Sequence, residues 1–252
     1  MQIKSTLRRI NRKYRQIVNL TITAIFLAIT CAVIMEYQSV LSKRQLEAAN
    51  KSTAELHYSI LARQDSLISE IDRLKIGISD ATQRTFKVTA AANTIKEVRK
   101  ELSETEAIKL ATMIYDECER SGVEFAYVLA IIQAESRFNH KVTSNVGAQG
   151  IMQIMPLTFI SIAKVYGYDY LESDINDLRK NLRIGTLFLH RLLQKMGSRD
   201  LASAAYNGGP KVAANYKRLV SGDSTAVVPT ETQNYVVTVN SYHAYYRKIL
   251  GE

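Results

Sequence analysis

Helix-breaking residues are almost absent from the first part of this chain. No proline precedes Pro156, and Gly77 is the only glycine before Gly122. Because proline and glycine are the residues that most often end helices, the stretch over 36–102 favours one long helix. The only run typical of a strand, residues 226–228, is too short to support a sheet. We therefore expect an all-α protein.

Residues 37–103 are expected to form a helical stalk with a mixed repeat of seven. One seam is mostly apolar: Leu46, Thr53, Ile60, Leu67, Leu74, Ala81, Val88, Ile95 and Leu102. The companion seam is poorer: Asn50, His57, Gln64, Ile71, Ile78, Thr85, Ala92 and Arg99. One good seam beside one mixed seam predicts self-association of the stalk, weaker than that of a strong coiled coil. A single helix or a partly disordered spacer is the alternative.

Residues 16–36 are predicted to form a transmembrane helix. The run from Gln16 to Met35 holds 20 residues without a charge. At about 1.5 Å per residue, a helix of this length spans the roughly 30 Å hydrocarbon core of a bilayer. A cleaved signal peptide is the alternative, but the run exceeds the usual ~7–15 apolar residues and no small-x-small cleavage site follows it.

The net charge of +9 is concentrated at one end of the chain. Residues 1–15 form a basic tail that carries six cations before the first acid, Glu36: Lys4, Arg8, Arg9, Arg12, Lys13 and Arg15. Basic residues beside a membrane span keep their side in the cytoplasm, so the C-terminal side is expected to cross the membrane. Because topology explains most of the excess charge, we expect no nucleic-acid partner.

Residues 104–252 are expected to fold as a separate helical domain. Ser103 and Glu106 form a capping-box pattern that starts a helix, and Gly122 is suited to end it. The following helices are predicted around 125–132, from Pro156 to near Gly167, over about 176–196, as two pieces broken at 208–210, and to residue 250 behind a Thr230–Gln233 cap. Cys118 is expected in the core, and it cannot pair with Cys31 in the membrane span.

One carboxylate lies on the apolar face of a predicted helix. Val128, Ile132 and Glu135 share that face because residues three and four apart are neighbours on a helix. A carboxyl group held against apolar walls keeps its proton longer, since desolvation penalises the charged form. Such a raised pKa suits a general acid near neutral pH.

Four motifs then occur in order along the chain. They are ESRFN at 135–139, SNVGAQGIMQIMP at 144–156, AAYNGGP at 204–210 and ETQNYV at 231–236. Together they resemble the soluble lytic transglycosylase family, whose catalytic domain has a goose-type-lysozyme-like fold and cleaves peptidoglycan. The resemblance covers roughly residues 110–249.

The resemblance implies that Glu135 is the single catalytic acid/base. It would protonate the oxygen between N-acetylmuramic acid and N-acetylglucosamine, and the muramyl 6-hydroxyl would close into a 1,6-anhydro product. Glycoside hydrolysis normally needs two carboxylates, and an internal hydroxyl reduces the need for the second. A hydrolytic muramidase on the same fold and a catalytically idle wall-binding scaffold are the alternatives.

The resemblance also implies the residues of the substrate cleft. They are Ser144, Gly147, Ala148, Met152, Gln153, Tyr206, Asn207, Glu231 and Tyr235. Among them, Tyr206 is expected to orient Glu135 or to stabilise developing charge. The acidic residues Asp169, Glu172, Asp174 and Asp177 are interpreted as loop and helix-start residues. No cofactor and no metal are expected.

The expected partners follow from this organisation. Peptidoglycan glycan strands would be the substrate, and residues 16–36 would contact membrane lipid. The chain is then a single-pass protein of a bacterial inner membrane with a periplasmic catalytic domain, or a protein of a phage virion membrane. Cell-wall remodelling, an envelope-spanning secretion or conjugation complex, and phage entry or exit are uses between which the sequence does not choose.

Overall fold

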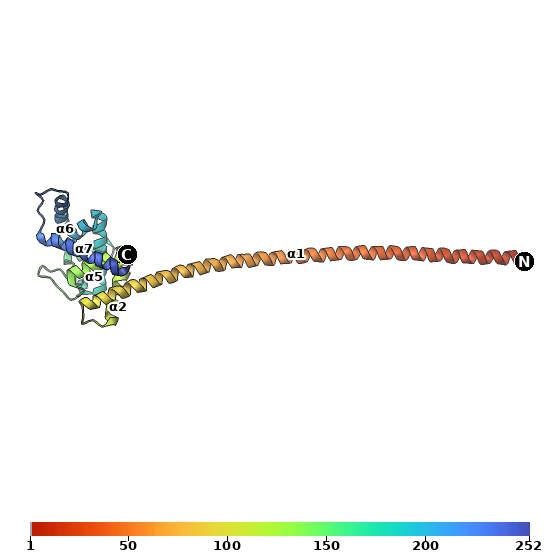
Figure 1. The fold of residues 1–252 in the computed structure, drawn as a ribbon, viewed down its shortest axis with the longest axis horizontal. Helices are drawn as coiled ribbons and strands as arrows, with labels where there is room; N and C mark the ends of the chain where they lie inside the picture. The colour runs from red at the N-terminus through yellow and green to blue at the C-terminus, as the bar shows by residue number, and fades with distance from the viewer. Residues whose placement is uncertain (1) are drawn as a thin grey trace. The chain divides into compact units, whose positions relative to one another are not determined.

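The first helix, α1, extends from Gln2 to Val98 in the computed structural model, which describes residues 2–252 (Figure 1). It contains an 18-residue window that is long and apolar enough to cross a membrane, and none of that window is buried by protein. The hydroxyl groups of Thr21, Thr23 and Thr30 donate to carbonyl oxygens four residues earlier. These bonds satisfy the hydroxyl groups within the helix, so threonine is compatible with a membrane span.

The chain divides into two units after Gly77, and the second unit is Ile78–Glu252. The last turns of α1 therefore belong with the residues that follow them. Val88 and Ile95 of the expected stalk seam are 8% and 0% exposed, and Ala91 and Ala92 between them are equally buried. Lys87 adds an ion pair in which its Nζ lies 2.6 Å from Glu252 Oε1.

This arrangement differs from the expected domain boundary at residue 104. A seven-residue apolar seam has the same appearance in sequence whether it covers a second helix or the core of its own domain. The C-terminal end of the seam is buried within the second unit, so residues 78–98 are structural parts of that unit.

The rest of the second unit is helical, as expected from the sequence. Its elements are α2 (Glu104–Ser121), α3 (Phe125–Ser136), α4 (Pro156–Val165), a short 3₁₀ helix η1 (Glu172–Asn176), α5 (Leu178–Met196), α6 (Arg199–Val220) and α7 (Thr230–Leu250). Over residues 2–252 no strand forms, and the only β-type pairs are the isolated bridges Thr143–Gln149 and Gln149–Ile154. The all-α prediction is confirmed.

Local signals place most of the helix ends. The Ser103–Glu106 capping box is formed, and Gly122 adopts the left-handed conformation that ends α2. Gly209, with φ 79° and ψ 172°, interrupts the helical path of α6 immediately before Pro210, as the predicted break requires. The predicted Thr230 cap is wrong, because α7 begins one residue earlier with Pro229 at the N-cap and no side-chain cap bond.

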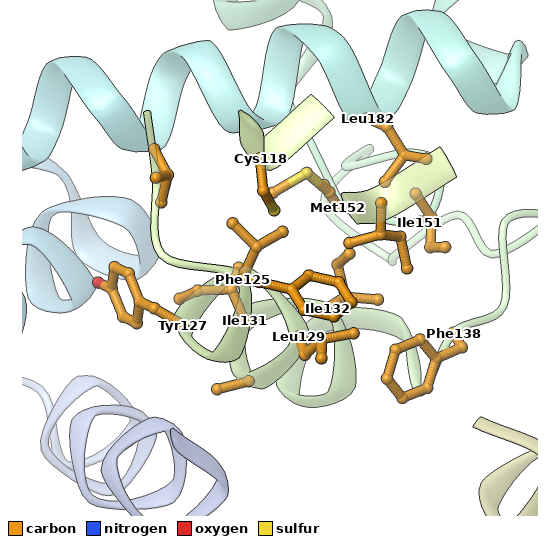
Figure 2. Close-up of a cluster of buried hydrophobic side chains, with 14 of the residues drawn as sticks. Cys118, Phe125, Tyr127, Leu129, Ile131, Ile132, Phe138, Ile151, Met152 and Leu182 are labelled. Atoms are coloured by element: carbon orange, nitrogen blue, oxygen red, sulfur yellow. The ribbon is translucent and has the colours of Figure 1, made fainter. Parts of the chain in front are cut away.

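Helix α3 lies at the centre of the core. Every residue from Phe125 to Ile132 is at most 6% exposed, so this helix is enclosed on all sides. It packs against α2 and α7, and α5 packs against α2, α4 and α6. Figure 2 shows Phe125, Leu129 and Ile132 of α3 gathered with side chains of neighbouring segments. Cys118, as expected, is one of these core residues at 2% exposed.

The burial of the end of α1 predicts where a stable fragment must begin. A fragment covering 78–252 should unfold at higher temperature than one covering 104–252, because the shorter fragment exposes the apolar surface under Val88 and Ile95. Loss of these contacts should cost about 2–5 kcal/mol of unfolding free energy. Calorimetry or denaturant titration of both fragments measures the difference.

Two substitutions in the longer fragment serve as a matched pair. Ile95→Ala should cost about 2–5 kcal/mol, because it leaves a cavity at a fully buried site. Asn93→Ala, at an exposed position on the same turn, should change stability by less than about 0.5 kcal/mol. Equal stability of the two fragments would show that α1 does not contribute to this core.

Candidate active site

Glu135 lies in the last turn of α3, at the end of the enclosed helix. The helix stops because Arg137 takes the left-handed conformation with φ 52°, and Phe138 follows with φ 62°. Phe138 is 1% exposed, so its burial offsets the strain of two successive positive φ angles. The chain therefore turns sharply away directly after Glu135, leaving its carboxyl group at the boundary of the core.

The carboxyl group of Glu135 is held by a tyrosine from α7. Tyr235 Oη donates a hydrogen bond of 2.6 Å to Glu135 Oε1. Burial raises the pKa of Glu135 from 4.5 to about 7, the Tyr235 hydrogen bond opposes this rise, and the charge of Glu231 adds to it. Desolvation is the largest of these effects, so the Glu135 carboxyl group keeps its proton to higher pH than an exposed glutamate does.

The sequence predicts that Tyr206 orients Glu135 or stabilises developing charge. In the structure the Tyr206 hydroxyl group donates its hydrogen bond elsewhere. Its hydroxyl group donates a hydrogen bond of 2.7 Å to the backbone oxygen of Met152. The Tyr206 ring packs on Phe188 of α5 with ring centroids 5.2 Å apart. The negative charge of Glu135 contributes to the raised pKa of Tyr206, so the two groups lie close together. Tyr235 takes the orienting position instead.

The loop after Glu135 is fastened by Ser144 and Ala148. Ser144 N–H donates to the Ala148 oxygen at 2.8 Å, and Ala148 N–H donates to Ser144 Oγ at 3.0 Å. Gly147 lies between them with φ 92°, a conformation that favours glycine. The Ser144 hydroxyl hydrogen is not used in this pair, so it is free to donate to another acceptor.

Two predicted cleft residues, Met152 and Ala148, are buried, at 0% and 9% exposed. Met152 belongs to the hydrophobic core, and Figure 2 shows it beside Cys118. The prediction that its side chain contacts sugar is therefore wrong for this conformation. The physical reason lies in α5, where Gly185 lacks a side chain and leaves room for the Met152 thioether. A Cβ at residue 185 would meet Met152 Sδ at 2.3 Å.

Gln153 and Asn207 line a hollow of about 520 Å³ beside Tyr206. Gln153 has φ 46°, and its Nε2 donates to the backbone oxygens of Val142 and Gly150. Asn207 Oδ1 accepts a hydrogen bond of 2.7 Å from Thr232 Oγ1 of α7. Each residue therefore has a fixed orientation and keeps unused polar atoms for a ligand.

The remaining acidic residues separate into two groups. Glu231 is exposed at the start of α7, and its charge reaches Glu135. Asp174 and Asp177 are helix-start residues as interpreted from the sequence. Asp174 accepts from Leu171 N–H and binds Lys180, while Asp177 caps α5 through Lys180 N–H. Glu231 is thus the carboxylate whose charge raises the pKa of Glu135.

Sequence reasoning missed the residues that support the loop. Asn181 of α5 is 1% exposed; its Oδ1 accepts from Met152 N–H and its Nδ2 donates to the Gln149 and Ile175 oxygens. Ser136 donates to the Ile151 oxygen at 2.6 Å. Gly150, at φ 82°, has no Cβ, and one there would meet Asn181 Nδ2 at 2.2 Å. A polar asparagine on the apolar face of the predicted helix at about 176–196 was the sequence signal that could have identified this support.

A metal site needs several metal-binding side chains close together. No group of three or more His, Cys, Asp or Glu side chains in residues 2–252 is arranged to hold a metal ion. Glu135 is the group at this site that is placed to transfer a proton, and the Tyr235 hydroxyl group is its hydrogen-bond partner.

Comparison with known proteins identifies relatives of this arrangement. A family model described as "Transglycosylase SLT domain" matches residues 112–228. The chain is 38% identical over 143 residues to the soluble lytic murein transglycosylase of Escherichia coli (strain K12), covering 52% of this chain and 22% of that protein. It is 31% identical over 176 residues to membrane-bound lytic murein transglycosylase C of Edwardsiella ictaluri, covering 57% of this chain and 48% of that protein.

A solved structure agrees with these sequence matches. The 70 kDa soluble lytic transglycosylase from Escherichia coli superposes with a TM-score of 0.53 and 28% identity, over 66% of this chain and 30% of that chain. The family resemblance and the helical fold expected from the four motifs are thus confirmed. The chain spans about a fifth of the length of the soluble relative and about half of the membrane-bound one.

The raised pKa of Glu135 predicts a pH-dependent stability that does not rely on any activity. The folded state holds this proton more tightly than the unfolded state, so stability falls as pH rises from 4.5 to about 7. Replacing Glu135 by Gln removes that penalty, and the variant should be more stable than wild type at pH 8 by about 2–3 kcal/mol. Denaturant titration at pH 4.5 and pH 8 measures the change.

The matched control is Glu172→Gln, which removes an exposed carboxylate from η1. It should leave the difference in stability between the two pH values unchanged. Should Glu135→Gln be no more stable than wild type at pH 8, the carboxyl group would have to be well solvated.

Proposed function

Because residues 112–228 form a transglycosylase SLT domain, we propose that this chain is a peptidoglycan lytic transglycosylase. It cleaves the β-1,4 bond between N-acetylmuramic acid and N-acetylglucosamine and leaves a 1,6-anhydromuramyl end. The observation that carries this proposal is the enclosed Glu135 carboxyl group, with a pKa of about 7 and a hydrogen bond from Tyr235.

The proposed reaction needs two proton transfers through one carboxyl group. Protonated Glu135 gives its proton to the glycosidic oxygen while the bond from that oxygen to the anomeric carbon breaks. The N-acetylglucosamine product leaves with a 4-hydroxyl group. The Glu135 carboxylate then takes the proton of the muramyl 6-hydroxyl, whose oxygen bonds to the anomeric carbon. A pKa near the working pH suits a group that must first give and then accept a proton.

The surroundings of Glu135 support a single acid/base. Positive charge that develops at the anomeric carbon can be met by the acetamido oxygen of the substrate, which replaces the second carboxylate of an ordinary glycosidase. Tyr235 holds Glu135 Oε1, so the hydrogen bond fixes the carboxyl group during both transfers. Ser144, Gln153 and Asn207 offer hydrogen-bonding atoms at the edge of the cleft.

We also propose how the chain sits in the membrane. The apolar part of α1, residues 16–36, crosses the bilayer and leaves the basic tail, residues 1–15, in the cytoplasm. The second unit then lies on the far side of the membrane, where peptidoglycan is found. A bacterial inner membrane provides this arrangement, and a phage virion membrane delivered to the envelope is the second setting.

We further propose that two copies associate through the stalk. Ile60, Leu67 and Leu74 occupy one seam position, and Gln64 and Ile71 occupy the other. The four apolar residues of this set are between 43% and 60% exposed. Ile71 at one seam position with Leu67 and Leu74 at the other favours a two-stranded pair, and a shared membrane imposes the parallel orientation.

Charge at the flanks of the seam supports the parallel pairing. Glu70 precedes the seam residue Ile71, and Lys75 follows the seam residue Leu74. In a parallel two-stranded coiled coil these two positions of neighbouring helices face each other, so Glu70 of each copy meets Lys75 of the other. Gln64 at the centre of the seam limits the strength of the pair and fixes its register.

The activity proposal predicts the products of purified peptidoglycan digestion. The full chain in detergent, and the fragment 78–252, should release muropeptides with 1,6-anhydro ends, which mass spectrometry identifies. Glu135→Gln should lower the rate by about a hundredfold or more, because the amide cannot transfer the proton. The rate should fall as pH rises above about 7, since the carboxyl group then loses its proton.

Two further variants make this test specific. Asp169→Asn, in the exposed acidic segment, should keep nearly all activity. Tyr235→Phe should move the alkaline fall in rate to higher pH, because its hydrogen bond lowers the pKa of Glu135. Reducing muramic acid ends in place of anhydro ends would make the chain a hydrolase, and full activity of Glu135→Gln would remove Glu135 from the reaction.

The stalk proposal predicts position-specific crosslinking. In the full chain with Cys31→Ser and reconstituted in vesicles, Leu67→Cys should form a disulfide-linked dimer on mild oxidation. Ser69→Cys, two residues away on the outer face, is the matched control and should crosslink about fivefold more slowly. Equal rates at the two positions would mean that copies collide without pairing through this seam.

A further inference from the structure

The hollow beside Tyr206 extends past the candidate active site. It is formed between α4, α5 and α6, and it shares Gln153, Tyr206 and Asn207 with the predicted cleft. Its far side consists of α5 residues that no motif singled out. Its volume of about 520 Å³ is in the range of small-ligand sites. A substrate held at Glu135 therefore has a neighbouring space in which a further group of the same molecule fits.

Two cations line this hollow and no acid does. Arg191 and Lys195 stand four residues apart on α5, so their side chains leave the same face of the helix. No aspartate or glutamate lines the space. Within residues 2–252 neither cation forms an ion pair or hydrogen bond with another side chain. Arg218 and Lys87 of the same unit, by contrast, have carboxylate partners.

The helix dipole at the C-terminal end of α5 accounts for only one of these two cations. Lys195 lies in the last turn of α5, where the helix dipole favours a cation. Arg191 lies a full turn earlier, and two like charges four residues apart on a helix repel each other. An anion between them would relieve that repulsion. The guanidinium group binds a carboxylate through two parallel hydrogen bonds, and the ammonium adds a point charge.

The other residues that line the hollow indicate what kind of molecule bears the anionic group. Leu157, Ile162 and Leu192 give an apolar wall, and Thr158 and Ser161 of α4 bring hydroxyl groups. Arg191 and Lys195 add positive charge to the same space. A peptide attached to a sugar supplies apolar side chains, amides and carboxylates together, which matches all three kinds of lining.

We propose that Arg191 and Lys195 bind a carboxylate of the peptide stem carried by an N-acetylmuramic acid residue of the substrate. This inference rests on the proposed function and names the part of peptidoglycan that the enzyme reads besides its sugars. The peptide stem is attached to the lactyl group of the muramic acid, so it lies beside the bond that is cut. Tyr206, shared by the hollow and the site of Glu135, links the two.

The test compares glycan strands with and without their peptides. The full chain, its Arg191→Gln/Lys195→Gln variant and a matched Lys164→Gln/Arg179→Gln variant, which removes two exposed cations outside the hollow, are assayed on both substrates. On peptide-bearing strands the first variant should lose about tenfold or more in kcat/KM, because the charged stem loses its partners. On peptide-free strands it should stay within about twofold of wild type. The matched variant should follow wild type on both.

A binding measurement separates this inference from the proposed function. Muramyl-tetrapeptide is titrated into the Glu135→Gln chain with and without the Arg191→Gln/Lys195→Gln changes, and the same peptide with amidated carboxyl groups is the second probe. The pair of changes should weaken binding of the acidic probe about tenfold and leave the amidated probe unaffected. Weaker binding of the acidic probe alone supports the site even if the wild-type chain cuts no strands.

Other outcomes overturn the inference. Equal loss of kcat/KM on both kinds of strand would assign the two cations to the fold or to the sugars. No loss on either kind, while wild type releases anhydro products, would leave the activity standing and remove the peptide site.

Discussion

Everything in the second unit, Ile78–Glu252, depends on the enclosure of one apolar helix. Eight successive residues, from Phe125 to Ile132, are removed from water, so α3 has no solvent face and must be covered on every side. A carboxyl group that must reach a substrate can be carried by such a helix only near an end. Glu135 occupies that end, and the core that excludes water from α3 is the same core that raises the pKa of its carboxyl group.

The loop that follows Glu135 is held by close approach of backbones. Gly150 and Gly185 leave room for Asn181 and Met152, and Asn181 in turn binds the backbone of the loop at Gln149 and Met152. A buried amide that meets donors and acceptors on three segments fixes them together, since leaving any of those groups unpaired would be costly. The loop is therefore fastened to α5 by buried hydrogen bonds and by close packing.

The end of α1 is part of this core. Its last turns bury Ile95 and Val88 in the second unit and are fastened by the ion pairs of Lys87 and Arg84. No proline occurs within α1, Gln2–Val98, and Gly77 is its only glycine. Residues 37–77 remain as the part of the stalk that is available for pairing with a second copy.

Local sequence determined the elements of this protein, and tertiary packing decided their roles. The absence of proline set α1, the capping box and Gly122 set α2, and the four motifs identified Glu135 and its neighbours, because each of these signals acts within a few residues. Three assignments needed the fold: Val88 and Ile95 belong to the core, Met152 is buried, and Tyr235 holds Glu135 across 100 residues of sequence. The sequence of an apolar seam or a motif residue does not show which surface it contacts. That contact is determined by packing between segments that are distant in the chain.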